Sequence, residues 1–123
     1  MYDQTNIFAK IIAGEVPCDE VYNDKNVLAF KDVSPAAPMH VLVIPKGEYV
    51  SFNDFATKAG TEKLANFFQT VQKIASDLGL EQDGYRLITN HGKNASQTVP
   101  HFHVHILGGK PLGGLLADDN LQR

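Results

Sequence analysis

The segment from His101 to Leu107 constrains this chain more than any other, because it reads His-Phe-His-Val-His-Ile-Leu. Successive side chains of a β-strand point to opposite faces of the sheet. An extended segment here therefore puts the three imidazoles on one face and Phe102, Val104 and Ile106 on the other. Three of the five histidines in the chain lie in this one segment. We interpret it as a strand with an apolar face for the core and a histidine face for chemistry.

Strict alternation also has a plainer interpretation, which is a half-buried strand with an ordinary polar face toward solvent. Histidine, however, is neither a favoured strand former nor a common surface residue. The clustering of three imidazoles therefore favours a functional row over a simple solvent-facing strand.

A chain of 123 residues, 43% of them hydrophobic, is long enough for one core and too short for two. We expect a single domain over residues 1–110, followed by a tail over residues 111–123 that has little to bury. The formal net charge is −3, and the lysines and arginines form no run. This charge pattern argues against a nucleic-acid partner.

The single cysteine, Cys18, excludes an internal disulfide and a cysteine-rich zinc framework. The apolar runs are far shorter than a membrane span, and the first residues of the chain are polar. We therefore expect no targeting segment, no membrane partner and a cytoplasmic location.

Apolar periodicity predicts two helices and five strands. The longer helix covers residues 61–77. The shorter has its apolar residues at positions 7, 8, 11 and 12, with Thr5 or Asn6 as its cap and Gly14 placed to end it. The predicted strands span residues 20–23, 27–31, 40–45, 85–90 and 102–107. Because adjacent strands have short connections, this order favours an α+β fold with a five-stranded antiparallel sheet and both helices packed on one side.

A row of imidazoles supports three kinds of chemistry: metal binding, nucleophilic attack by a neutral ring, and anion binding by protonated rings. Repulsion between neighbouring imidazolium ions lowers at least one pKa and keeps a neutral ring available near pH 7. A bound zinc ion is ordinarily neutralised by a carboxylate or thiolate, and residues 96–109 contain neither. We therefore place nucleophilic catalysis first and expect neither a metal nor another cofactor.

Neutral hydrogen-bonding side chains flank the histidine row. Ser96, Gln97 and Thr98 come just before it, and Asn90 ends the neighbouring predicted strand. Hydroxyls, amides and backbone N–H groups suit phosphate oxygens, although each of these residues alone also fits ordinary turn chemistry. Their clustering predicts a phosphate site beside the histidines.

The histidine segment matches, at all seven positions, the signature of the histidine triad (HIT) superfamily, in which three histidines alternate with apolar residues. Further stretches resemble the histidine triad nucleotide-binding (Hint) branch of that superfamily. The resemblance covers nearly the whole chain except the tail, and it is carried by residues 6–12, 28–35, 37–46 and 84–87.

This resemblance implies a homodimer in which two five-stranded sheets join edge to edge as one continuous ten-stranded sheet. It also implies a pocket for a purine nucleotide such as AMP. The implied enzyme is a hydrolase that cleaves the P–N bond of adenosine phosphoramidates through a nucleotidyl-histidine intermediate. Two alternatives stay open: a dinucleoside polyphosphate hydrolase with the same nucleophile, and a non-catalytic nucleotide-binding interaction module.

The resemblance also implies roles for single residues. His103 matches the nucleophile, and His105 matches the residue that holds the phosphate oxygens. His101 matches a residue linked to His40 in a supporting network. Asp32 matches the residue that grips the ribose hydroxyls. The other matches belong to the nucleotide site, at the base, the phosphate or the leaving group, namely Ile7, Phe8, Phe30, Val33, Asn90, Ser96, Gln97 and Thr98.

The chain departs from the family pattern in three places. Ser96 stands where glycine is expected beside the phosphate, and Thr98 stands where serine is common, which adds a methyl group beside the leaving group. Residues 6–9 read Asn-Ile-Phe-Ala where some bacterial relatives have Cys-x-x-Cys. We therefore expect no structural zinc at that position.

Overall fold

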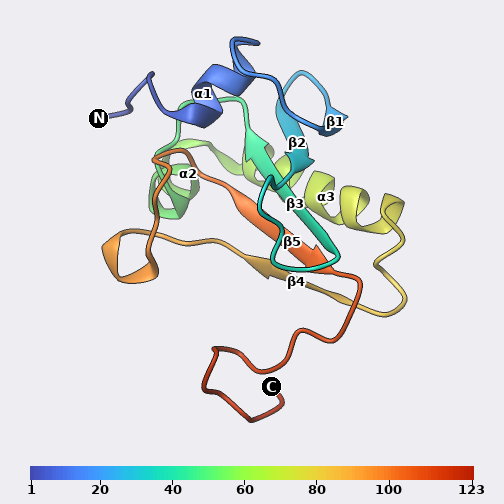
Figure 1. Cartoon of the computed structure of the whole chain (residues 1–123). Coiled ribbons are helices and arrows are strands. Elements are labelled where there is room, and N and C mark those ends of the chain that lie inside the picture. The colour runs from blue at the N-terminus through green and yellow to red at the C-terminus, as the bar shows by residue number, and fades with distance from the viewer.

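In the computed structural model, which describes residues 1–123, five strands form one antiparallel sheet in the order β1-β2-β3-β5-β4 (Figure 1). The strands are β1 (Glu20–Asn23), β2 (Val27–Lys31), β3 (Met39–Pro45), β4 (Tyr85–Ile88) and β5 (Val104–Gly108). The helices are α1 (Ile7–Ile12), α2 (Phe52–Lys58), α3 (Thr61–Asp77) and the short 3-10 helix η1 (Lys93–Ala95).

The sheet places the histidine strand between two partners. β5 pairs with β3 on one side and with β4 on the other, so His105 lies opposite Leu42 and Ile88. β2 pairs with β3 along its whole length. Strand β5 is therefore an interior strand, and its two faces see different surroundings.

The predicted bounds of α3, β1 and β2 are confirmed, and α1 covers the apolar positions predicted for the first helix. Asn6 caps α1, because its side-chain oxygen accepts the N–H of Ala9 at 2.9 Å. The turn before β2 is held by Asp24, whose carboxylate accepts the N–H groups of Asn26 and Val27 at 2.7 and 2.8 Å. Local capping and turn chemistry explain why these elements were predictable.

Four strand ends differ from the prediction, and one of them is the end of β5, which lies at Gly108 instead of residue 107. β3 begins one residue earlier, at Met39, and β4 ends at Ile88 instead of residue 90. β5 begins at Val104 instead of residue 102. The backbone before β5 bonds outside the sheet ladder, since the Phe102 N–H donates to the carbonyl of Tyr49 at 2.7 Å. His101 and His103 therefore precede the paired part of the strand.

The prediction of two helices was wrong, because α2 adds a third. α2 is seven residues long and buries Phe55 alone, so it is too short to show helical periodicity in the sequence. The short helix η1, in the loop before β5, was not predicted either. None of the helices combines the length and the apolar character needed to cross a membrane.

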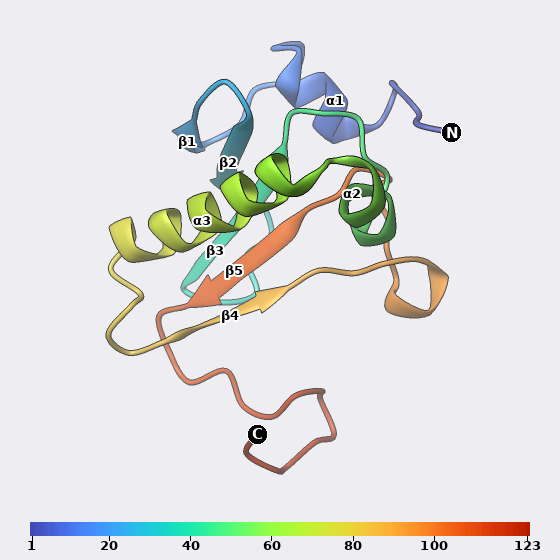
Figure 2. The ribbon, with the colours of Figure 1, turned by 180° about the vertical axis from the view of Figure 1, so that it is seen from behind.

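The helices also lie on both faces of the sheet, which corrects the prediction of one side. On the first face, Phe67 of α3 and Phe55 of α2 pack against Phe102. Figure 2 shows α3 crossing this face. On the second face, Phe8 of α1 packs against Phe30 with a ring separation of 5.5 Å. The histidine face is the one that α1 covers.

The tail after residue 110 contains no helix or strand. Arg86 of β4 contacts it by donating to the carbonyls of Gly113 and Gly114 at 2.9 and 3.1 Å. Leu115 and Leu116 are exposed there. The tail thus runs beside the β4 edge of the sheet.

Candidate active site

The three histidines lie on the face of the sheet that carries α1, as strict alternation predicts. His101 is fully buried, His103 is 8% exposed and His105 is half-buried. The ring of Phe8 stands edge-on to His103 at 5.0 Å, and His103 in turn lies 5.2 Å from His105. The residues between the histidines point into the opposite core.

The hydrogen bonds of His40 assign the tautomer of His105. The N–H of Ala36 donates to His40 Nδ1 at 3.0 Å, so the proton of a neutral His40 sits on Nε2. That Nε2–H donates to His105 Nδ1 at 2.8 Å. A neutral His105 therefore carries its proton on Nε2, where it is available to a bound anion.

The tautomer of His103 is the reverse. Its Nδ1 lies 2.7 Å from the carbonyl oxygen of His101, and a carbonyl only accepts, so Nδ1 must carry the proton. The other nitrogen, Nε2, keeps its lone pair. His103 thus offers a nucleophilic nitrogen and His105 offers a donor, side by side in the segment that ends in β5.

His101 makes no hydrogen bond to His40, so the structure shows no direct contact behind the supporting network that the family resemblance implied. Its Nε2 donates to the carbonyl of Pro45 at 2.8 Å, and its Nδ1 accepts from the hydroxyl of Tyr2 at 2.6 Å. The register explains this arrangement: His40 lies opposite Leu107, one diagonal step from His105, whereas His101 precedes the paired strand.

Burial favours the neutral form of these rings. It lowers the pKa of His101 to about 4 and the pKa of His105 to about 4, and it lowers the pKa of His103 from its usual 6.5. Repulsion from neighbouring imidazoles adds to the shifts of His101 and His105. The sequence predicted a lowered pKa from repulsion, and the structure makes burial the larger cause.

Asp32 follows β2 directly and joins the histidine face from outside the histidine segment. One carboxylate oxygen lies 3.5 Å from His40 Nε2, and the other accepts the N–H of Ser34 at 2.8 Å. The backbone N–H of Asp32 donates to the carbonyl of His40 at 3.0 Å. Asp32 is therefore fixed beside the His40–His105 pair.

One group of side chains has the composition of a metal site. Asp32, His40 and His105 each offer a ligand atom, and the three atoms lie within 4.8 Å of one another. The two ring nitrogens are 2.8 Å apart and share a proton. Two nitrogens on one tetrahedral zinc ion lie about 3.4 Å apart, given Zn–N bonds of about 2.05 Å. An ion would therefore have to displace this proton and separate the rings.

The predicted phosphate residues lie in the loop from β4 to β5. Ser96 has φ 58°, the left-handed region, which explains why glycine is expected there. The Gln97 amide is used within the loop, where it accepts from the Gly92 N–H at 2.9 Å and donates to the Val50 carbonyl at 2.8 Å. No hydrogen bond joins Asn90, Ser96 or Thr98 to the histidines.

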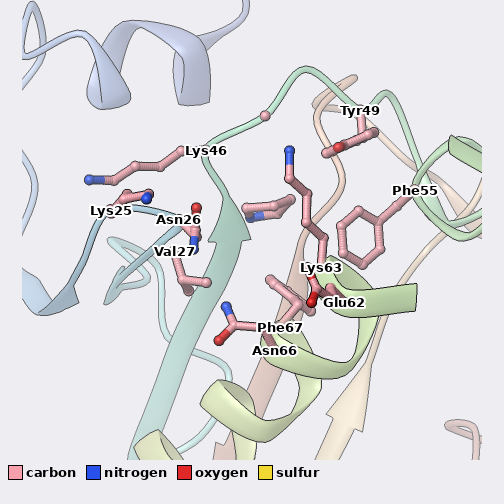
Figure 3. A pocket seen from close by; sticks show the side chains of 12 residues that line it. Lys25, Asn26, Val27, Lys46, Tyr49, Phe55, Glu62, Lys63, Asn66 and Phe67 are labelled. Atoms are coloured by element: carbon pink, nitrogen blue, oxygen red, sulfur yellow. The ribbon is translucent and has the colours of Figure 1, made fainter. Parts of the chain in front are cut away.

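A cavity of about 590 Å³ lies on the other face of the sheet and contains none of the predicted site residues. Lysines 25, 46 and 63 stand around it, with Tyr49 and Phe55 among its aromatic residues (Figure 3). Lys46 donates to Asn23 at 2.6 Å and extends away from Lys63. The ammonium groups of Lys46 and Lys63 therefore do not meet at one ligand position, and the histidine face remains the candidate site.

Tyr2 is the residue of the site that sequence analysis missed. Its ring lies edge-on to His101 at 5.6 Å, besides donating the hydrogen bond to that ring. The two residues are 99 positions apart in the sequence. No periodicity or spacing marks a tyrosine in the polar segment before a helix, so only the tertiary fold could reveal the contact.

The fold and the site together define a class of protein: a small α+β domain in which one strand presents a nucleophilic imidazole beside an imidazole that donates. A family model described as the HIT domain matches residues 13–112. The match includes the histidine row, Asp32 and His40. The chain belongs to the HIT family.

Similar proteins agree with this assignment. An uncharacterised HIT-like protein of Rickettsia prowazekii is 48% identical over 120 residues, which are 98% of this chain and 100% of that protein. A protein of Escherichia coli K12 named purine nucleoside phosphoramidase is 43% identical over 118 residues, 96% of this chain and 98% of that protein. A solved HIT family hydrolase from Clostridium thermocellum gives a TM-score of 0.85 at 42% identity and covers 93% of this chain and 99% of that chain.

Proposed function

We propose that this protein is a cytoplasmic nucleoside phosphoramidase that hydrolyses the P–N bond of adenosine phosphoramidates. The tautomer of His103 is the observation that carries the proposal. His103 Nδ1 donates its proton to the His101 carbonyl oxygen, 2.7 Å away, so Nε2 keeps its lone pair. A neutral imidazole nitrogen of this kind attacks phosphorus readily. The relative named purine nucleoside phosphoramidase supports the choice of substrate.

In the first proposed step, His103 Nε2 forms a bond to the α-phosphorus as the P–N bond to the amine breaks. The amine leaves with that electron pair and takes a proton from water. His105 donates its Nε2–H to a phosphate oxygen, where negative charge grows in the transition state. The hydroxide left when the amine takes its proton then attacks the phosphorus of the nucleotidyl-imidazole. The bond from phosphorus to His103 Nε2 breaks, which releases the nucleoside monophosphate and restores neutral His103.

The nucleotide is proposed to lie between α1 and the loop after β2. Ile7 is 43% exposed and Val33 is 97% exposed, and apolar side chains left open to solvent suit the faces of a purine base. Phe8 and Phe30 are buried behind them. Asp32, next to Val33, is proposed to accept hydrogen bonds from the ribose hydroxyls.

The loop before β5 is proposed to contact the phosphate and the leaving group. Asn90, Ser96 and Thr98 supply groups with no side-chain bond to the histidines, so they are free to meet the substrate. Gln97 acts through the loop, because its amide already bonds to Gly92 and Val50. Its proposed contribution is to hold the loop near the phosphate.

We also propose a homodimer that pairs two copies through β4. β4 is an edge of the sheet, and its residues Leu87 and Ile88 are exposed. The backbone of an edge strand has unpaired N–H and C=O groups that invite pairing, and two-fold pairing would make a continuous ten-stranded sheet. Light scattering should give twice the chain mass of 13.5 kDa. A monomer at micromolar concentration would contradict the dimer and leave the site chemistry in place.

One assay separates this function from the other nucleotide chemistries of the same site. The protein is mixed with an adenosine phosphoramidate, a diadenosine polyphosphate and AMP, with and without a chelator. We expect rapid turnover of the phosphoramidate, slow or no turnover of the diadenosine compound, and no loss on chelation.

The matched control is His91→Asn, which alters a histidine outside the row whose ring bonds to Ser51 at 2.8 Å. This variant should keep its turnover. Preferred hydrolysis of the diadenosine compound would identify a dinucleoside polyphosphate hydrolase. AMP binding with no turnover of either substrate would identify a binding module.

A further inference from the structure

The first six residues form a folded segment that the proposed reaction does not use. Asn6 is buried and donates from its side chain to the carbonyl of Asp3 at 2.7 Å. The Asp3 carboxylate accepts the N–H of Thr5 at 2.9 Å. The side chain of Gln4 donates to Glu48, in the loop after β3. These bonds fix the course of the segment and bring Tyr2 to one place on the domain.

That place is the buried ring of His101. The Tyr2 hydroxyl lies 2.6 Å from His101 Nδ1. The other ring nitrogen donates to the carbonyl of Pro45, so Nδ1 has no proton and the tyrosine must be the donor. His101 is 0% exposed, and its Nδ1 makes no other hydrogen bond, so this nitrogen has the Tyr2 hydroxyl as its one protein donor.

The same residue, His101, holds the nucleophile. Its backbone carbonyl accepts the Nδ1–H of His103 at 2.7 Å. His101 is thus bonded at three points: its ring to Tyr2 and to Pro45, and its carbonyl to His103. A ring that loses one of these partners must rotate, change tautomer or take a proton to satisfy the freed nitrogen.

We propose that Tyr2 is a positioning residue, which holds the His101 ring so that the His101 carbonyl keeps the proton of His103 on Nδ1 and leaves Nε2 free. Tyr2 does not touch the reacting atoms and acts through His101. The consequence for turnover rests on the proposed function, whereas the consequence for the histidine tautomers does not. A small misplacement of a reacting group lowers kcat by about ten- to a hundredfold and leaves substrate binding largely intact.

The test is Tyr2→Phe, which removes the hydroxyl and keeps the ring. The matched control is Tyr22→Phe, because the Tyr22 hydroxyl makes a bond of the same 2.6 Å length to Asp24 beside β1, away from the histidines. Nitrogen NMR of histidine-labelled protein reports which ring nitrogen of each histidine carries the proton. kcat and KM for an adenosine phosphoramidate are measured on the same samples.

In Tyr2→Phe, the ring-nitrogen signals of His101 and His103 should shift, and kcat should fall about tenfold or more with KM nearly unchanged. Tyr22→Phe should leave both unchanged. Unaltered histidine signals, or shifted signals with a normal kcat, would overturn the inference and leave Tyr2 as a structural residue.

The proposed function and the proposed role of Tyr2 can be rejected independently of each other. Shifted signals in a protein whose wild type turns over no phosphoramidate would reject the proposed function and keep the Tyr2–His101–His103 linkage.

Discussion

The two faces of the segment that ends in β5 are both largely buried, and they are built in opposite ways. On one face, Phe102 stacks on Phe55 at 4.6 Å and belongs to a cluster of buried apolar residues. On the other face, His101 and His103 are buried to a similar extent, and their rings bond to backbone carbonyls. The first face is stabilised by packing of apolar side chains. On the second face, hydrogen bonds satisfy the polar atoms of the buried rings.

This difference teaches how a buried polar face becomes chemically specific. A buried ring nitrogen without a partner is costly, and no buried side-chain nitrogen or oxygen here lacks one. Each bond that satisfies a ring also decides which of its nitrogens holds the proton. Burial of the histidines therefore determines which tautomer each ring adopts. On the apolar face, burial requires only that the side chains fit together in shape.

The largest expected effect tests the histidine face. His103→Asn removes the proposed nucleophile, so turnover of an adenosine phosphoramidate should fall by about three orders of magnitude or more. Nucleotide binding should persist, and the free energy of unfolding should change little, because this face is held by several separate hydrogen bonds. Steady-state kinetics, AMP titration and urea unfolding on one preparation check the three expectations. Near-normal turnover would make the histidine row a binding surface.

The matching change on the apolar face is Phe102→Ala. It removes a buried ring that contacts Phe55 and Phe67, so it should destabilise the fold by about 3–5 kcal/mol. Where the variant is still folded, its kcat should stay within a few fold of the wild type. Urea unfolding measures the loss. Equal destabilisation by His103→Asn and Phe102→Ala would erase the distinction between the two faces.

The pH dependence of stability should come from the histidine face. The folded pKa values of His101 and His105, about 4, lie below the ordinary value of 6.5. The unfolded chain therefore binds protons first, and stability present above about pH 6.5 is lost as the pH falls toward 4, by a few kcal/mol in total.

Urea midpoints measured between pH 7 and pH 4.5 would show this loss. Replacement of one ring, in His105→Asn, should make the dependence shallower. A midpoint that is flat over this range in the wild type would mean that the rings are not held neutral by burial.

The smallest effect concerns Asp32, which joins the histidine face from the end of β2. Asp32→Asn should weaken binding of adenosine ribonucleotides about tenfold and of the matching 2′-deoxyribonucleotides much less, because a charge-assisted bond to a hydroxyl is worth about 1.5–3 kcal/mol. Calorimetric titration with both sugars measures the difference. Equal losses would assign Asp32 to the support of His40 instead of the ribose.

Much of the fold was predictable because its signals are local. The helix α3 has four turns of apolar periodicity, and Asn6 and Asp24 mark an N-terminal cap and a turn. α2 was missed because it has two turns and one buried residue. The packing of α1 on the second face was missed because sequence order does not say which face a helix covers.

The site also has a part that the sequence predicts and a part that it does not. Alternation was enough to place the histidines together, and the family resemblance added Asp32 and His40. The partner of each ring depended on register and on contacts between distant segments. His40 meets His105 because of the β3–β5 register, and Tyr2 meets His101 across 99 residues. Neither pairing leaves a local pattern in the sequence.

The most direct test of the central claim is to trap the covalent intermediate. Wild-type protein is mixed with an adenosine phosphoramidate, quenched within milliseconds at alkaline pH to preserve an acid-labile bond, digested and mapped by mass spectrometry. The account predicts an adenylyl group on His103 and none in His103→Asn. An adenylyl group on His40 or His91, or turnover with no covalent adduct at any time, would contradict it.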